Sequence, residues 1–386
     1  MLIMKFGGTS VANDNSRRAA IDHILQAPCI PVVVVSAMGR KGSPYATDTL
    51  RELVQREGGE VPRRDMDLIM ACGEIVSAVV MAQAIRNRGH KAKALTGGQA
   101  GIATDGNYGS ARATGVDSTP IQKLIDEGII PVVAGFQGDY DGDFTTLGRG
   151  GSDTSAAILG KALQADEVQI FTDVEGVLTT DPNLNKDAKF IPFLTYEEVL
   201  EMAQLGAKVI HPKAVEICAE ERIPLRIKCT TKNSNGTLIA ANPESGNLKN
   251  KQVVTSVAVI AGRSLVTIKD ADPELVFQRV AKAGVSVDLI NVSPETISFT
   301  VDTVEKAKVE QALPGAGISI GYGKVSVIGA AMRGVPGVMA KVVGALAKRG
   351  ISIERTADSH TSISCLVKEE DLKIAVEALH DAFLLG

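Results

Sequence analysis

The sequence is organised around the segment Thr146-Leu147-Gly148-Arg149-Gly150-Gly151-Ser152-Asp153-Thr154-Ser155-Ala156. Its three glycines let backbone N–H groups approach a ligand closely, because no Cβ intervenes. Ser152 is a residue type that caps helices, and Asp153 would place a carboxylate in the first helical turn. Small and apolar residues from Thr154 onward predict that helix. A glycine loop that leads into a helix N-terminus is suited to binding an anion.

Arg149 gives this loop a second anion-binding group. Its planar guanidinium offers five donors in a fork that suits a carboxylate or a phosphate. A tight turn followed by an ordinary helix cap is the alternative, although such a turn needs neither an arginine nor three glycines. We therefore interpret the segment as a ligand-binding loop.

Composition and charge limit the classes of function. The 386 residues carry a net charge of −4, and only 4% are aromatic, with no tryptophan. Binding of nucleic acid or of an anionic membrane is disfavoured, because neither a basic surface nor base-stacking rings are indicated. A chain of this length is expected to form roughly two to three domains.

The cysteines and the N-terminus indicate the compartment. The five cysteines are scattered without a Cys-x-x-Cys pair, so neither a zinc site nor a disulfide framework is indicated. The N-terminus reaches Lys5 and Gly7-Gly8 too early for a signal peptide. We find no apolar run of the about 18 residues that span a membrane. We expect a soluble, cytoplasmic protein with no membrane or nucleic-acid partner.

Apolar strand-like segments alternate with helical patterns through residues 1–230. The runs Ile30–Val35 and Ile129–Ala134 are typical of strands buried on both faces of a parallel sheet. Other strands are expected at Leu2–Phe6, Lys91–Leu95, Glu167–Phe171 and Leu225–Lys228, and the turn-rich segment Asp139–Asp143 predicts a hairpin tip. The alternation predicts an α/β fold with a mainly parallel sheet between helices. Loops at the carboxyl ends of such strands are expected to meet in one ligand crevice.

The C-terminal part reads as a tandem repeat. Residues 231–252 are polar and typical of a linker. Beyond them, two repeats follow the order strand-helix-strand-strand-helix with a period of roughly 60 residues. The first repeat is expected to open with a strand at Ser264–Lys269, and Ala-Gly-Val-Ser-Val (283–287) and Arg-Gly-Ile-Ser-Ile (349–353) occupy equivalent places.

Lys5 and Glu74 are candidate site residues. Lys5 ends the first strand before Gly7-Gly8, where a lysine can bridge two phosphates; an exposed lysine beside a turn is the alternative. No P-loop string occurs, and no Gly-x-Gly-x-x-Gly follows a strand. Glu74 lies in an apolar helical stretch, where a carboxylate needs a partner. A substrate ammonium or an internal salt bridge could supply it.

Several polar turns carry weaker signals. Thr47-Asp48 opens a helix and could be a plain N-cap. Thr172-Asp173 and Asp181-Pro182 could bind ribose or phosphate-bound magnesium, which typically takes only one or two protein carboxylates. Turn chemistry alone explains these pairs equally well. Lys208 is a weaker candidate, and none of the five histidines has a metal-like or triad-like partner.

Together these motifs resemble those of the aspartokinases, members of the amino-acid kinase family. The matching strings are Lys5-Phe6-Gly7-Gly8-Thr9-Ser10, Ser36-Ala37-Met38-Gly39, Cys72-Gly73-Glu74, Gly135-Phe136-Gln137-Gly138, Gly148–Ala156, Thr172–Val177 and Thr180-Asp181-Pro182. The Met38–Asp48 loop looks most like monofunctional aspartokinases of spore-forming Gram-positive bacteria. The bifunctional form, with a homoserine dehydrogenase segment, is not expected.

The resemblance implies an amino-acid kinase fold at 1–230, a linker at 231–252, and two α+β, ferredoxin-like ACT domains. The ACT domains would cover 263–320 and 323–386, and strand 253–260 would pair with the second. ACT domains sense small molecules, usually between paired copies. A homodimer or larger homo-oligomer with feedback inhibition is therefore implied, with lysine, threonine or diaminopimelate as the effector.

The resemblance also implies the reaction and its residues: ATP-dependent phosphorylation of the L-aspartate β-carboxylate to 4-phospho-L-aspartate. The catalytic residues would be Lys5 and Asp153, and the aspartate-binding residues would be Thr47, Glu74, Arg149 and Ser152. The ATP site would contain Lys5, Phe6, Gly7, Gly8, Thr172, Asp173, Leu178, Asp181 and Lys208. Magnesium would be carried by ATP, without direct protein ligands. The effector candidates are Asp272, Asn291 and Val292.

The sequence departs from the family pattern at two places, and other functions stay open. Leu178 stands where an aromatic residue is common, and Asp272-Pro273-Glu274 stands where a Pro-Gly turn is usual. An acetylglutamate or uridylate kinase-like enzyme is one alternative, although an acetylated amine would not need the Glu74 carboxylate. A non-catalytic amino-acid sensor is the other, although Lys5, Arg149 and Asp153 argue against it.

Overall fold

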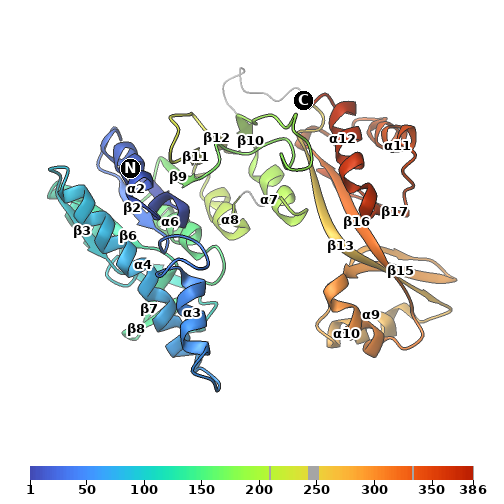
Figure 1. Ribbon diagram of the computed structural model, residues 1–386, viewed down its shortest axis with the longest axis horizontal. Helices are drawn as coiled ribbons and strands as arrows, with labels where there is room; N and C mark the ends of the chain where they lie inside the picture. The colour runs from blue at the N-terminus through green and yellow to red at the C-terminus, as the bar shows by residue number, and fades with distance from the viewer. Residues whose placement is uncertain (208–209, 242–251, 333, 386) are drawn as a thin grey trace. The chain divides into compact units, whose positions relative to one another are not determined.

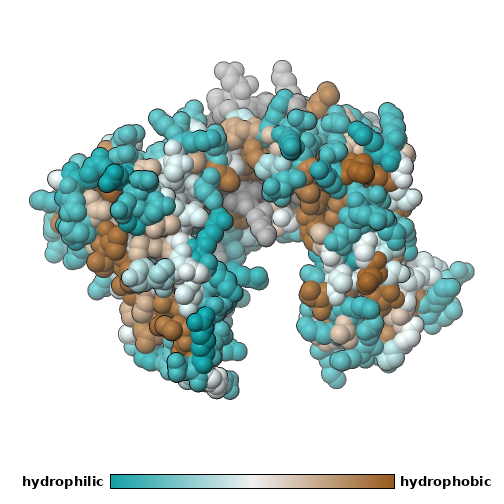
Figure 2. Space-filling model, in the orientation of Figure 1, coloured by the Kyte–Doolittle hydropathy of each residue, from teal (hydrophilic) through white to brown (hydrophobic). Residues whose placement is uncertain are grey.

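The computed structural model describes residues 1–207, 210–241, 252–332 and 334–385. The chain divides into two compact units. The first unit comprises Met1–Val177, Phe190–Leu200 and Val209–Leu248, and the second comprises Leu178–Lys189, Glu201–Lys208 and Lys249–Gly386. Hydrophilic residues cover much of the visible face of each unit, and hydrophobic residues gather in smaller separate patches (Figure 2).

An eight-stranded sheet forms the centre of the first unit, in the order β10-β12-β11-β9-β1-β2-β6-β3 (Figure 1). The strands are β1 (Leu2–Phe6), β2 (Val32–Val35), β3 (Ala92–Leu95), β6 (Ile130–Ala134), β9 (Glu167–Thr172), β10 (Phe193–Leu194), β11 (Leu225–Cys229) and β12 (Thr237–Ile239). The pairs from β11 to β3 are all parallel, and β12 is antiparallel to β11. The mainly parallel α/β sheet is therefore confirmed.

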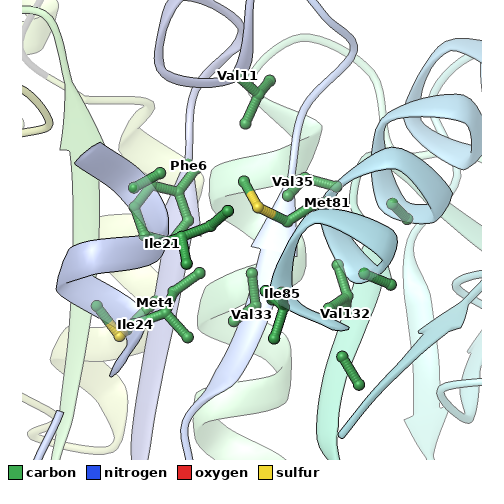
Figure 3. Close-up of a cluster of buried hydrophobic side chains, with 14 of the residues drawn as sticks. Met4, Phe6, Val11, Ile21, Ile24, Val33, Val35, Met81, Ile85 and Val132 are labelled. Atoms are coloured by element: carbon green, nitrogen blue, oxygen red, sulfur yellow. The ribbon is translucent and has the colours of Figure 1, made fainter. Parts of the chain in front are cut away.

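Helices cover both faces of this sheet. They are α1 (Gly8–Val11), α2 (Asp14–Leu25), α3 (Thr47–Gln55), α4 (Arg63–Arg86), α5 (Thr119–Asp126), α6 (Gly151–Ala162), α7 (Tyr196–Gln204) and α8 (Pro212–Glu220). Met4 and Phe6 of β1 pack with residues of α2 and α4 in one buried hydrophobic cluster (Figure 3). Side chains alternate along a strand, so Ile3 and Lys5 point to the opposite face, which α6 covers. This alternation directs Lys5 toward α6.

A smaller sheet was missed by the sequence analysis except for its hairpin. Its order is β5-β4-β7-β8, formed by β4 (Ile102–Thr104), β5 (Ala113–Val116), β7 (Gln137–Tyr140) and β8 (Asp143–Thr146). The β7–β8 hairpin has its tip where the Asp139–Asp143 turn residues predicted one. β4 and β5 are too short and too polar to show the alternating apolar pattern of a strand. β8 leads directly into the glycine loop.

α4 is the most apolar long helix of the first unit. By length and composition alone it could cross a membrane, which corrects our expectation that no apolar run approaches that length. In the folded chain it packs on β3, β6 and β8, and 44% of its most apolar window is buried. Core helices pass the same compositional test, and α4 carries the buried carboxylates of Asp67 and Glu74.

The second unit is built on a six-stranded antiparallel sheet in the order β14-β15-β13-β16-β18-β17. The strands are β13 (Ser256–Lys269), β14 (Asp288–Val292), β15 (Thr296–Asp302), β16 (Gly317–Ile328), β17 (Arg355–Asp358) and β18 (Ser362–Lys368). The helices are α9 (Pro273–Lys282), α10 (Lys306–Ala312), α11 (Val338–Lys348) and α12 (Leu372–Ala382). The two predicted repeats have separate hydrophobic cores on this one sheet.

β13 and β16 run through both repeats (Figure 1). Residues 256–260 of β13 pair with 324–328 of β16, beside the second repeat, and residues 265–267 pair with 317–319, beside the first. Residues 253–260 and Ser264–Lys269 were expected to be two separate strands. The register shifts between Ile260 and Leu265 instead, and the strand continues.

The second unit also holds a short segment, Leu178–Lys189, from within the sequence of the first. The Thr179 carbonyl accepts a hydrogen bond from the Val257 N–H at 2.8 Å. The Thr179 hydroxyl lies 2.8 Å from Nε2 of His380, a buried residue of α12. Burial lowers the pKa of His380, which favours the neutral ring that this contact uses.

Candidate active site

A cavity of about 690 Å³ in the first unit lies at the carboxyl ends of β1, β2, β6 and β8. Seven of the predicted site residues line it: Lys5, Gly8, Thr47, Glu74, Arg149, Ser152 and Asp153. The loops that follow these strands therefore meet in one crevice, as the parallel sheet predicts. Gly8 allows the β1 and β2 loops to touch, since a Cβ there would lie 2.5 Å from the Gly39 carbonyl oxygen.

Lys5 and Asp153 form an ion pair in this cavity. Nζ of Lys5 lies 2.5 Å from Oδ1 of Asp153, and 10% and 16% of the two side chains are exposed. β1 supplies the lysine, and the first turn of α6 supplies the carboxylate. The Lys5 ammonium can exchange the Asp153 carboxylate for a phosphate oxygen of a ligand at the N-terminus of α6. Its positive charge then stays paired with a negative one.

Glu74 is a buried carboxylate with one unpaired oxygen. Its Oε1 accepts hydrogen bonds from the Ala37 N–H at 3.1 Å and from the Thr47 hydroxyl at 3.4 Å. Its Oε2 has no hydrogen-bond partner among the described residues. Desolvation raises the pKa of this carboxyl to about 7, and the two hydrogen bonds and the charge of Lys5 oppose the shift only in part. Oε2 is therefore free to pair with a donor from a ligand.

The glycine loop differs from the predicted helix cap. Gly150 takes the N-cap position in a left-handed conformation with φ of 66°, so α6 begins at Gly151 and Ser152 lies inside its first turn. The expectation that Ser152 caps the helix was therefore wrong. A Cβ on Gly150 would lie 2.1 Å from the His211 ring, so both conformation and packing require glycine. Ser152 is buried in the cavity wall.

Thr47 is likewise not a helix cap. The N-cap of α3 is Ala46, which offers no side-chain hydrogen bond, and the Thr47 hydroxyl faces Glu74 instead. Arg149 lines the cavity from the glycine loop, and its side chain forms no ion pair among the described residues. A guanidinium, a carboxylate with a free oxygen and an ammonium therefore face one cavity.

The predicted nucleotide residues divide into several groups. The Phe6 side chain is buried and stacks on Phe171 with ring centroids 4.6 Å apart, so only its backbone is available to a ligand. The Gly7 N–H donates to the Phe171 carbonyl at 3.0 Å. Thr172 ends β9, and Asp173 forms an exposed ion pair with Arg40 at 2.6 Å.

Among the remaining predicted residues, those that the structure describes do not line the first unit's cavity. Leu178 and Asp181 belong to the second unit, and Lys208 lies outside the described residues. Among the effector candidates, Asp272 caps α9 by accepting from the Glu274 N–H at 3.0 Å. Asn291 and Val292 are exposed on β14. None of these three lines the first unit's cavity.

Asp67 is a buried residue near the cavity that the sequence analysis missed. It accepts hydrogen bonds from Gly109 and Thr146, both of which line the cavity. Its sequence signal was its place seven residues before Glu74 in an apolar helix, because that spacing puts two carboxylates on one helix face.

Comparisons with known proteins agree with this geometry. The family model described as "Amino acid kinase family" matches residues 1–229, and an "ACT domain" model matches residues 317–381. The chain is 41% identical to Aspartokinase 1 of Bacillus subtilis (strain 168), over 100% of this chain and 99% of the relative.

Two solved structures of E. coli aspartokinase III resemble the chain. One is the complex with aspartate and ADP, described as the R-state, with a TM-score of 0.78, 25% identity and 100% of each chain covered. The other is the complex with lysine and aspartate, described as the T-state, with a TM-score of 0.77, 26% identity and 99% of each chain covered. The fold prediction is thereby confirmed, and the chain belongs to the aspartokinases of the amino acid kinase family.

Proposed function

We propose that the first unit transfers the γ-phosphoryl group of ATP to the β-carboxylate of L-aspartate, giving ADP and 4-phospho-L-aspartate. The observation that carries the proposal is the free, buried Oε2 of Glu74 in a cavity that also contains Arg149 and the Lys5–Asp153 pair. An amino acid with a free ammonium supplies the cation that Glu74 lacks. The aspartate and ADP held by E. coli aspartokinase III support the same substrates.

The chemistry needs positioning rather than a general base. A β-carboxylate with a pKa near 3.9 is ionised at neutral pH, so its oxygen can attack phosphorus directly. The new P–O bond forms as the bond to the β-phosphate oxygen breaks, and ADP leaves. Catalysis then consists of alignment and of neutralising charge on the transferring group. A cavity of glycine N–H groups, a lysine and an arginine suits that task.

Each cavity residue receives a role on this basis. Glu74 binds the α-ammonium of aspartate, and Arg149 binds the α-carboxylate as a bidentate fork. Thr47 and Ser152 lie near the β-carboxylate. Lys5 neutralises the transferring phosphoryl group, and Asp153 holds the Lys5 ammonium in place.

The nucleotide binds beside the loops that follow β1 and β9. Phe6, Gly7, Gly8, Thr172 and Asp173 line its site, with Leu178, Asp181 and Lys208 added from further along the chain. Magnesium enters bound to the ATP phosphates, where it neutralises negative charge, and needs few protein carboxylates. Among the described residues no group of three or more metal-ligating side chains occurs.

The second unit regulates the first in this proposal. We assign the catalytic domain to 1–230, the linker to 231–252, and ACT domains to 263–320 and 323–386, with strand 253–260 in the second. Lysine, threonine or diaminopimelate is the feedback effector, and Asp272, Asn291 and Val292 contribute to its site. The lysine complex of E. coli aspartokinase III supports an amino-acid effector. The enzyme is a cytoplasmic homodimer or larger homo-oligomer.

The test measures ADP release with ATP and L-aspartate, N-acetylglutamate or UMP as the acceptor. Hydroxylamine traps the acyl phosphate as aspartyl hydroxamate, which distinguishes the product from hydrolysed ATP. We expect turnover and hydroxamate with L-aspartate alone, and inhibition by one of the three effectors. Turnover with N-acetylglutamate or UMP would favour the alternative kinases. No acceptor-dependent turnover would favour the non-catalytic sensor.

A further inference from the structure

Asp67 is a fully buried carboxylate held only by hydrogen bonds. Its Oδ2 accepts from the backbone N–H groups of Gly109 and Thr146, each at 2.8 Å, and its Oδ1 accepts from the Thr146 hydroxyl at 2.7 Å. Its exposure is 0%, and no described lysine, arginine or histidine forms an ion pair with it. The three donors satisfy both oxygens of Asp67, as a buried polar group without a cation partner requires.

These hydrogen bonds join three walls of the cavity. Asp67 lies on α4, two helical turns before Glu74, so about 10 Å of rigid helix separates the two carboxylates. Gly109 belongs to the loop between β4 and β5, Thr146 belongs to β8, and both residues line the cavity. Thr146 ends β8 and lies three residues before Arg149, and Gly109 approaches the same loop, since its carbonyl oxygen lies 3.5 Å from where a Gly148 Cβ would be.

We propose that Asp67 is a positioning residue that sets the distance between Arg149 and Glu74. The inference rests on the proposed function, in which Arg149 binds the α-carboxylate of aspartate and Glu74 binds its α-ammonium. The α-carboxylate and the α-ammonium are bonded to the same carbon of aspartate. Arg149 and Glu74 must therefore stay at one fixed distance from each other. α4 supplies Glu74 directly and, through Asp67, fixes the start of the loop that supplies Arg149. Asp67 touches neither substrate nor nucleotide.

Asp67→Asn is the test variant, because asparagine keeps the shape and removes one acceptor. With its amide nitrogen turned to the Thr146 hydroxyl, the neutral amide oxygen holds the two backbone N–H groups more weakly than the carboxylate does, so the loop shifts. We expect the KM for aspartate to rise about ten- to a hundredfold, since an ångström of misplacement has that effect. The KM for ATP should change little, because the nucleotide residues lie on other loops.

Two substitutions at Thr146 give a graded series that is independent of the buried charge. Thr146→Val removes the hydroxyl donor but keeps the backbone N–H, and should raise the aspartate KM less than Asp67→Asn does. Thr146→Ser keeps both donors, so its KM for aspartate should equal that of the parent chain. This series tests the inference even if Asp67→Asn does not fold.

Asp143→Asn is the matched control. Asp143 begins β8, and Nε of Arg64 on α4 donates to its Oδ2 at 2.8 Å. It therefore joins the same helix to the same strand, but at the end remote from the glycine loop and at the surface. We expect both KM values to stay within about twofold of the parent, as for a solvent-exposed ion pair.

Isothermal titration of L-aspartate is measured beside the kinetics, so that binding is observed without turnover. A normal aspartate affinity in folded Asp67→Asn would overturn the inference and leave the proposed function intact. An equal loss of affinity for both substrates, or an equal effect of Asp143→Asn, would also overturn it. If the parent chain binds no aspartate, the proposed function itself fails.

Discussion

Glu74 is the residue whose ionisation governs the aspartate site near neutral pH. Its pKa of about 7 means that the carboxylate that binds the substrate ammonium is a minor form at pH 6 and the major form at pH 8. We expect the KM for aspartate to be about tenfold higher at pH 6 than at pH 8, because one pH unit on each side of the pKa changes the ionised fraction by that factor. Initial rates across this range measure it.

Glu74→Gln provides the control for this pH dependence. It should raise the aspartate KM at every pH and flatten the profile, while the ATP KM keeps its parent profile. The raised pKa of Glu74 also affects the stability of the fold. The folded chain retains a proton that the unfolded chain releases at about 4.5, so the free energy of unfolding should fall as pH rises from 4.5 through 7. If the aspartate KM of Glu74→Gln depended on pH as that of the parent does, the assignment of Glu74 to the substrate ammonium would be contradicted.

Arg149 is the other residue that selects the amino-acid substrate. Arg149→Ala should raise the aspartate KM by about tenfold or more, because a charge-assisted hydrogen bond to a carboxylate contributes about 1.5–3 kcal/mol. The ATP KM should change little. Arg56→Ala is the matched control, since Arg56 is 76% exposed on the same unit and does not line the cavity. Equal loss of both affinities would instead place Arg149 at the phosphates.

The place of a candidate residue at the cavity was predictable where its side chain stands in a short motif. Lys5, Glu74 and Arg149 stand in short motifs whose chemistry follows from residue type, and all three line the cavity. Ser152 was misread because its cap depends on the conformation of Gly150, which the packing of His211 fixes from 61 residues away. Such a constraint leaves no local signal.

Elements of the second unit share one sheet but have separate cores. Phe299 of β15 is fully buried in the first repeat and lies 5.8 Å from Phe277, measured between ring centroids. We expect Phe299→Ala to reduce the local free energy of unfolding by about 3–5 kcal/mol, because the aromatic ring leaves a cavity. Faster hydrogen exchange of the β15 amides would show this, while the amides of β1 keep their parent rates.

Val304→Ala is the control for that substitution. Val304 belongs to the same repeat but is 85% exposed, so its truncation should change stability by less than about 0.5 kcal/mol. Equal effects of the two variants would mean that the first repeat lacks the hydrophobic core described for it.

Elements were predictable where their period was continuous. β1 and β6 appear within one residue of their expected bounds, because burial on one or both faces leaves a clear apolar pattern. The length of β13 was not predictable, since a strand that passes a glycine by shifting register looks like two strands in sequence. β17 begins at Arg355, two residues after the Arg-Gly-Ile-Ser-Ile segment at 349–353, because pairing with β18 sets its start.

At the scale of the whole molecule, the sequence predicted two parts but not how the chain is shared between them. The parallel sheet and the antiparallel repeat each follow from local pattern. The membership of Leu178–Lys189 in the second unit does not, because it depends on contacts made some 75 to 200 residues later, such as those of Thr179 with Val257 and His380. Long-range pairing of this kind has no short-range signature.

The interleaved segment has a consequence for how such enzymes can be inherited and recombined. A gene cut after residue 230 would leave Thr179 without the strand and helix that hold it, so the separated N-terminal piece would not be an intact half. A chimaera that joins the N-terminal part of one relative to the C-terminal part of another must keep Thr179 compatible with Val257 and His380. Exchange of regulation between such genes is therefore constrained at a position inside the part of the chain that the amino acid kinase model matches.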